Sequence, residues 1–172
     1  MLHLLGCPAH SEFRLHKLLA QCRERVPAVA GLRADFIHLA ETVEPLSDDE
    51  LNLLEQLLDY GPRRSTAESQ GIQLVVVPRP GTISPWSSKA TDIVHNCGLD
   101  KVRRVERGVL YVLEPVAGES LDDGQRETLL PLVHDRMTES VLFDLDDTDS
   151  LFRHAVPAPV GRVDVIEGGR AA

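Results

Sequence analysis

Hydroxyl, cationic and aromatic side chains are concentrated in one short stretch, residues 79–92, which follows a run of β-branched residues. It holds Arg79, Thr82, Ser84, Trp86, Ser87, Ser88, Lys89, Thr91 and Asp92. Backbone N–H groups at a helix start are unpaired, and with Ser/Thr hydroxyls and a cation they form a natural seat for a phosphate or carboxylate. The stretch is therefore a candidate contact or anion-binding surface.

The same residues also fit a structural explanation. Ser84 or Ser87 would cap a helix, Pro85 would occupy its first turn, and Trp86 would pack on the core. The stretch is not a P-loop, because the GxxxxGK[ST] spacing is absent before Lys89. We expect no nucleotide hydrolysis at this stretch.

Charged residues alternate along the strand predicted further on. Arg103 and Arg107 lie on one face of it, whereas Arg104 and Glu106 lie on the other. Arg107 is therefore a second candidate for contact with a partner or an anion. Ordinary surface ion pairs, each worth under about 1 kcal/mol, would explain the same pattern.

Three other groups of residues have simpler explanations than catalysis or metal binding. His95 and Cys97 could suggest a nucleophile and its base, but Cys97 lies on an apolar helical stripe, which predicts a core residue. Residues 134–139 fit the solvated end of a helix. The acidic residues at 144–149 lack the glycine and the terminal glutamate of an EF-hand loop. We predict no catalytic residue and no metal site.

The charge balance limits the classes of partner. The 172-residue chain has a formal net charge of −9, yet residues 79–107 hold six cations against three anions. Nucleic-acid binding generally needs an extended basic face, so we expect no nucleic-acid partner.

Three scattered cysteines predict no disulfide framework. The apolar runs are far shorter than the roughly 20 residues of a membrane helix, and the start resembles no secretory signal, so we expect a cytoplasmic protein without a membrane partner.

Apolar periodicity and capping signals predict four helices. Their expected starts are Ser11, Ser47, Ser84 or Ser87, and Ser120. The second carries a capping box from Ser47 to Glu50 and is expected to stop at Gly61-Pro62, and the fourth is expected to run from Leu121 to about Arg136. The five predicted strands are Leu2–Leu5, Asp35–Ala40, Ile72–Val77, Val102–Leu113 and Val141–Leu145, with Gly108 marking a bulge or a close approach.

This alternation of strands and helices predicts an α+β fold, with helices packed on one face of a largely antiparallel sheet. The polar residues 63–70 are expected to loop outward and to divide the fold into two halves of similar size. Residues 1–153 form the predicted domain. Residues 154–172, which contain several Pro and Gly, form a predicted linker.

Long stretches of the chain resemble the amino-terminal region of the large, single-chain phosphoribosylformylglycinamidine synthases. The similarity is carried by Arg79–Ile93, His95–Leu99 and Arg104–Gly108, with flanking matches at Phe13–Leu19, Asp48–Glu50, Leu57–Gly61 and His134–Glu139. It covers nearly the whole chain. In that family the amino-terminal domain resembles a fused dimer of the small PurS subunit, which would agree with two halves.

The resemblance implies a non-catalytic domain of an ATP- and glutamine-dependent ligase, which converts formylglycinamide ribonucleotide to formylglycinamidine ribonucleotide in purine synthesis. The implied partners are the synthetase and glutaminase domains of a longer chain, which this domain would bridge to support ammonia transfer. ATP and Mg would be bound in the synthetase domain, and no cofactor by this one. Residues 79–92 and Arg107 would then contact partner domains or lie near substrate. The alternative is a stand-alone regulatory or scaffold module that binds a phosphorylated metabolite.

Overall fold

The computed structural model describes residues 1–62, 71–153, 159–161 and 165–169. Strands and helices alternate in the predicted order, followed by a 3-10 helix and a short last helix. The elements are β1 (Leu2–Pro8), α1 (Glu12–Arg25), β2 (Val29–Thr42), α2 (Asp48–Leu57), β3 (Ile72–Pro78), α3 (Pro85–Asn96), β4 (Val102–Pro115), α4 (Asp123–Val133), β5 (Glu139–Leu142), η1 (Leu145–Phe152) and α5 (Val165–Gly168).

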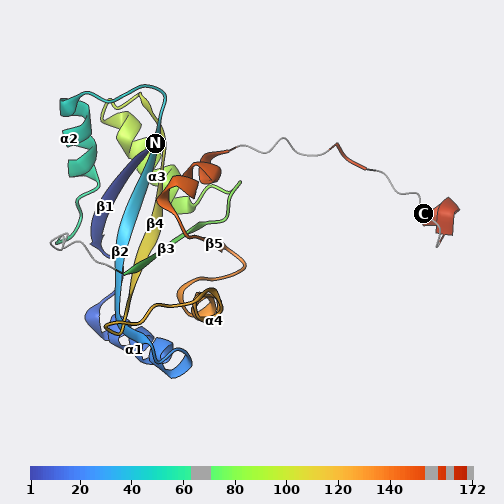
Figure 1. Cartoon of the computed structure of the whole chain (residues 1–172). Helices are drawn as coiled ribbons and strands as arrows, with labels where there is room; N and C mark the ends of the chain where they lie inside the picture. Colours follow the sequence, from blue (N-terminus) through green and yellow to red (C-terminus); the bar gives the residue numbers. More distant parts are fainter. Residues whose placement is uncertain (63–70, 154–158, 162–164, 170–172) are drawn as a thin grey trace.

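The described strands form one antiparallel sheet in the order β1-β2-β4-β3-β5 (Figure 1). β2 and β4 are both 14 residues long and pair along almost their whole length. β3 reaches only the second half of β4, where it pairs with residues 109–113. Among the described residues, no strand pairs with this edge in the first half of β4, and α3 lies along it.

Helices α1 to α4 pack on one face of the sheet, as predicted. α1 and α4 cover one end of it and share a core with Ala34, Leu74 and Tyr111. α2 and α3 cover the other end, around Ala40 and Val105 (Figure 1). The α+β class and the largely antiparallel sheet are thus confirmed.

The opposite face of the sheet has its own apolar cluster. Ile37, Val75 and Leu110 point to this side and pack with Leu151 and Phe152 of η1. The 3-10 helix was not expected from the sequence. It begins where the Asp144 carboxylate accepts a hydrogen bond from the Asp146 backbone N–H at 3.0 Å, and it replaces the end of the last predicted strand.

Several predicted boundaries are wrong for local reasons. β2 begins six residues before Asp35, because its first half packs against α1. α2 ends at Leu57 rather than at Gly61, since Tyr60 turns back to hydrogen-bond with His38 at 2.7 Å. α4 is capped by Asp122 rather than Ser120, because Asp122 forms a capping box with Gln125. β5 stops at Leu142.

Other local predictions are confirmed. Ser47 and Glu50 form the predicted capping box, and Ser11 caps α1. A Cβ on Gly108 would lie 2.7 Å from the Val76 carbonyl oxygen, so this glycine permits the close approach of β3, while the pairing of β2 with β4 continues through it without a bulge.

Residues 63–70 and most of the predicted linker, namely 154–158, 162–164 and 170–172, lie outside the described residues. The division into two halves and the domain boundary at 153 therefore remain predictions. Within the described part of the chain, no helix combines the length and the apolar character that crossing a membrane requires.

Candidate functional site

The stretch of residues 79–92 forms the turn after β3 and the first two turns of α3. Ser84 is the N-cap of α3: its Oγ accepts a hydrogen bond from the Ser87 backbone N–H at 2.9 Å, and Pro85 follows in the first helical turn. The same Ser84 hydroxyl donates to Glu106 Oε1 at 2.6 Å. The donor of this hydroxyl and one of its two acceptor lone pairs are thus used inside the domain.

A row of side chains on α3 pairs with the uncovered edge of β4. Ser87 Oγ donates to the Val105 carbonyl at 2.6 Å, and Thr91 Oγ1 accepts from the Val105 backbone N–H at 3.1 Å. His95 Nε2 donates to the Val102 carbonyl at 2.6 Å. These three residues are spaced four apart and therefore share one helix face. They satisfy backbone groups that a neighbouring strand would otherwise pair.

A buried ion pair lies beneath the helix start. Arg104 donates to Glu106 Oε2 at 2.8 Å, with side chains that are 11% and 0% exposed. Arg104 also donates to the Thr82 carbonyl at 2.9 Å and stacks over the Phe152 ring at 5.0 Å. This network ties the turn after β3 to the face covered by η1. The alternation of charges predicted that Arg104 and Glu106 share a face, but not that the carboxylate is fully buried.

Arg107 lies on the helix-covered face, in a setting of aromatic rings. Its guanidinium carbon lies 4.2 Å from the centre of the Phe36 ring and 4.8 Å from that of Trp86. One of its N–H groups donates to the Tyr60 hydroxyl at 3.3 Å. Within the described part of the chain, no carboxylate lies within 4.0 Å of this half-buried cation.

Trp86 and Tyr60 are themselves held in place by His38. The Trp86 and His38 rings have centroids 5.7 Å apart, and the Tyr60 ring meets His38 edge-on at 5.5 Å. Burial is the main cause that raises the pKa of Tyr60, while hydrogen bonding to Arg107 acts in the opposite direction. Contacts within the domain therefore hold the aromatic groups that surround the Arg107 cation.

The other predicted residues of the stretch are exposed. Arg79 is anchored at its backbone, whose N–H donates to the Thr138 carbonyl at 3.0 Å, and Thr82 Oγ1 donates to the Arg79 carbonyl at 2.6 Å. Ser88, Lys89 and Asp92 lie on the outer face of α3. Among the described residues, Arg79, Lys89 and Asp92 have no ion-pair partner.

The structure thus separates the predicted site residues into two sets. The hydroxyls of Ser84, Ser87 and Thr91 are committed to internal hydrogen bonds, as the structural explanation expected. The cations of Arg79, Lys89 and Arg107 remain without carboxylate partners among the described residues. A groove of about 320 Å³ beside α3, lined by Ile83, Ser88, Asp92, Arg103 and Phe152 among others, adds an apolar component to this surface.

Two other predictions can be compared with the structure. Cys97 was expected in the core but is exposed, because α3 ends at Asn96 and Leu99 takes the buried position instead. The residues around His134 do lie at the end of a helix, and His134 Nδ1 donates to the Leu130 carbonyl at 2.6 Å. They also line a cavity of about 870 Å³ that the sequence did not indicate, since its opposite wall comes from α1.

A family model described as formylglycinamide ribonucleotide amidotransferase N-terminal matches residues 35–152. The match begins within β2 and ends at the last residue of η1. It therefore includes residues 79–92, the Arg104–Glu106 pair, and Arg107 with the three aromatic residues around it, Phe36, Tyr60 and Trp86.

Proposed function

Because the chain belongs to the formylglycinamide ribonucleotide amidotransferase N-terminal family, we propose that it positions other domains of that amidotransferase rather than performing a chemical step. The family places it in a ligase of purine biosynthesis that uses glutamine as amido donor. In the proposed role, this cytoplasmic domain bridges the synthetase and glutaminase domains and supports ammonia transfer between them. The synthetase domain, not this one, binds ATP and Mg.

The observation that carries the proposed contact is the state of Arg107. A guanidinium presents five N–H donors in a planar fork, and only one of them is used by Tyr60. Aromatic faces on Phe36 and Trp86 hold the cation without neutralising it. Such a preorganised fork suits a carboxylate or phosphate that another domain or its substrate supplies.

Two exposed cations flank the segment that carries Trp86. Arg79 lies at the start of the turn and Lys89 lies in α3, and the groove beside α3 offers Ile83, which is exposed, as an apolar contact. Interfaces commonly combine an aromatic or apolar centre with charged groups around it. The combination supports a contact with another protein domain.

The hydrogen bonds of the hydroxyl groups support positioning over catalysis. Ser84 and Ser87 donate to Glu106 and to the Val105 carbonyl, so neither is poised as a nucleophile. The cations Arg79, Lys89 and Arg107 have no carboxylate partner among the described residues, and cations can orient a substrate or a domain without taking part in bond making.

The test uses the full-length amidotransferase that contains this chain. Arg107→Gln is expected to lower glutamine-dependent amidation about tenfold or more, because a charge-assisted hydrogen bond to a partner is lost. Arg79→Ala and Lys89→Ala should lower it less, since their side chains are exposed. Amidation is measured with glutamine and, separately, with ammonia, and unfolding is followed to exclude a loss of stability.

Arg126→Gln is the control. It removes the same charge from α4, outside the proposed surface, where the side chain is 35% exposed and pairs with Asp123 at 3.4 Å. The control should leave both amidation rates nearly unchanged. If Arg107→Gln, Arg79→Ala and Lys89→Ala also leave both rates at the wild-type level, the proposed contact surface is wrong.

A further inference from the structure

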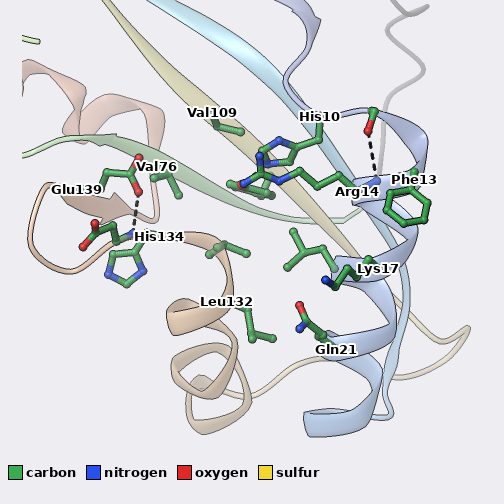
Figure 2. A pocket seen from close by; sticks show the side chains of 15 residues that line it. His10, Phe13, Arg14, Lys17, Gln21, Val76, Val109, Leu132, His134 and Glu139 are labelled. Carbon is green, nitrogen blue, oxygen red and sulfur yellow. Dashed lines mark hydrogen bonds between the residues drawn. The ribbon is translucent and has the colours of Figure 1, made fainter. Parts of the chain in front are cut away.

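The cavity of about 870 Å³ lies between α1 and the turn that joins α4 to β5 (Figure 2), and none of residues 79–92 lines it. Its volume falls in the range of about 300–1,000 Å³ that is typical of small-molecule sites. One wall comes from α1, the opposite wall from residues 132–139, and the floor from the sheet. The walls differ in charge, and this difference indicates the kind of ligand.

The wall formed by α1 is cationic. Arg14 and Lys17 are three residues apart, so they project from the same helix face. Figure 2 shows Arg14 extending toward His10 and Lys17 facing the open space. Among the described residues, neither cation has a carboxylate within 4.0 Å, so both are available to an anion.

The floor is apolar and carries an uncharged hydrogen-bonded pair. Val76 and Val109 contribute aliphatic surface, and the Tyr111 hydroxyl is hydrogen-bonded to His10 Nε2 at 2.8 Å. Burial raises the pKa of Tyr111 to about 12, with a smaller contribution from the charge of Glu139. Burial, followed by the charge of Arg14, lowers the pKa of His10. The floor therefore adds no charge at neutral pH.

The opposite wall carries two carboxylates whose orientation is fixed by the turn. Asp135 Oδ1 accepts from the Met137 backbone N–H at 2.8 Å, and Glu139 Oε2 accepts from the Asp135 backbone N–H at 2.8 Å. The second oxygen of each carboxylate has no hydrogen bond to the described residues. These oxygens remain as acceptors for a donor that enters the cavity.

We propose that this cavity binds a small phosphorylated metabolite that carries N–H donors at the end opposite its phosphate, as a mononucleotide does. The phosphate lies against Arg14 and Lys17, where charge-assisted hydrogen bonds are strong. The N–H groups donate to Asp135 and Glu139, and the ring or sugar lies over Tyr111 and the two valines. The cavity shares no lining residue with the proposed interdomain surface, although Arg79 bonds to Thr138 of the adjoining turn, and the proposal does not depend on the bridging role.

Calorimetric titration of the 172-residue chain tests the proposal. The ligands are the four common ribonucleoside monophosphates, with ribose 5-phosphate, adenosine and inorganic phosphate as partial probes. At least one mononucleotide should bind about tenfold or more tightly than every partial probe, because each partial probe loses contact with one wall. No binding of any mononucleotide at millimolar concentration, or equal affinity for inorganic phosphate, would overturn the proposal.

Substitutions in each wall then test which part of the ligand that wall binds. Lys17→Gln and Arg14→Gln should weaken the mononucleotide and ribose 5-phosphate alike, each about tenfold. Glu139→Gln should weaken the mononucleotide but leave ribose 5-phosphate unchanged. Circular dichroism and urea unfolding verify that each variant is folded.

Arg25→Gln is the matched control, because Arg25 lies on the same helix and carries the same charge but does not line the cavity. It should leave every affinity unchanged. If it weakens mononucleotide binding as much as Lys17→Gln does, the ligand is attracted by the overall charge of α1, and the proposed phosphate position is wrong. The assignment of the acidic wall is likewise wrong if Glu139→Gln weakens ribose 5-phosphate equally.

Discussion

Three arginines on one strand show how differently one residue type can be used. Arg103 makes an exposed ion pair with Glu41, and Arg104 makes an almost fully buried one with Glu106. Arg107 is held between aromatic rings with no carboxylate among the described residues. The strand period places Arg104 on the opposite face from the other two. Burial and neighbouring rings, which depend on the fold, decide which of them can meet a partner.

Ser87 illustrates the structural use of a residue that the sequence marked as a candidate contact. Its hydroxyl donates to the Val105 carbonyl and accepts from Arg104 Nε at 3.2 Å, and the side chain is fully buried. The Ser87→Ala change leaves both groups without this partner, so the free energy of unfolding should fall by about 1–3 kcal/mol. Urea denaturation measures it.

Ser88→Ala is the control for that prediction. Ser88 is exposed and follows Ser87 directly, and among the described residues its hydroxyl makes just one hydrogen bond, a long one to the Ser84 carbonyl at 3.5 Å. The free energy of unfolding should change by no more than about 0.5 kcal/mol. Equal effects of the two substitutions would contradict the assigned role of Ser87.

At the scale of elements, side chains of α3 form the hydrogen bonds that a neighbouring strand would otherwise form with the first half of β4. Ser87, Thr91 and His95 pair with the half of β4 that β3 does not reach. Capping chemistry predicted where α3 begins, because Ser84 and Pro85 are local signals. The edge pairing could not be predicted, since it depends on how far β3 extends along β4.

The start of α2 is joined to the start of β4 by a single carboxylate. Glu50 accepts from the Ser47 backbone N–H in the capping box and from Lys101 Nζ at 2.9 Å. Hydrogen bonding to Lys101, followed by that to the Ser47 backbone, lowers the pKa of Glu50 from 4.5 to about 2. Ionised Glu50 therefore stabilises the folded state.

This shift predicts how stability depends on pH. Because the pKa is lower in the folded state, the contribution of Glu50 is complete above its usual pKa of 4.5 and is lost as the pH falls toward about 2. The difference in unfolding free energy between wild type and Glu50→Gln should shrink over that interval. Urea denaturation at several pH values measures it, with Glu24→Gln, an exposed carboxylate on α1, as control. An undiminished difference at the acidic end would contradict the prediction.

At the scale of the whole molecule, local signals predicted the order of elements, the α+β class and the helix-covered face. They did so because caps, apolar periods and β-branched runs act over a few residues. The cavity beside α1 could not be predicted from local signals. Arg14 and Lys17 face Asp135 and Glu139 across the cavity because α1 and residues 132–139 pack against the same sheet. The aromatic surroundings of Arg107 could not be predicted from the sequence either, because Phe36, Tyr60 and Trp86 come from three separate segments.

One face of the sheet presents Arg107, which has no carboxylate partner among the described residues, and η1 completes the core on the other face. In the proposed role, the first face orients a neighbouring domain of the amidotransferase. Removing the domain should then separate the two chemistries without abolishing either, because no reacting group would be lost.

The most direct measurement compares glutamine-dependent amidation, ammonia-dependent amidation and glutaminase activity in the amidotransferase with this domain deleted, and again after the domain is added back in trans. If the domain bridges the other two, its deletion removes glutamine-dependent amidation while glutaminase and ammonia-dependent amidation persist, and adding the domain restores the coupling. Unchanged glutamine-dependent amidation after deletion would contradict a bridging role. Loss of ammonia-dependent amidation together with glutaminase activity would contradict the claim that the domain only positions its partners.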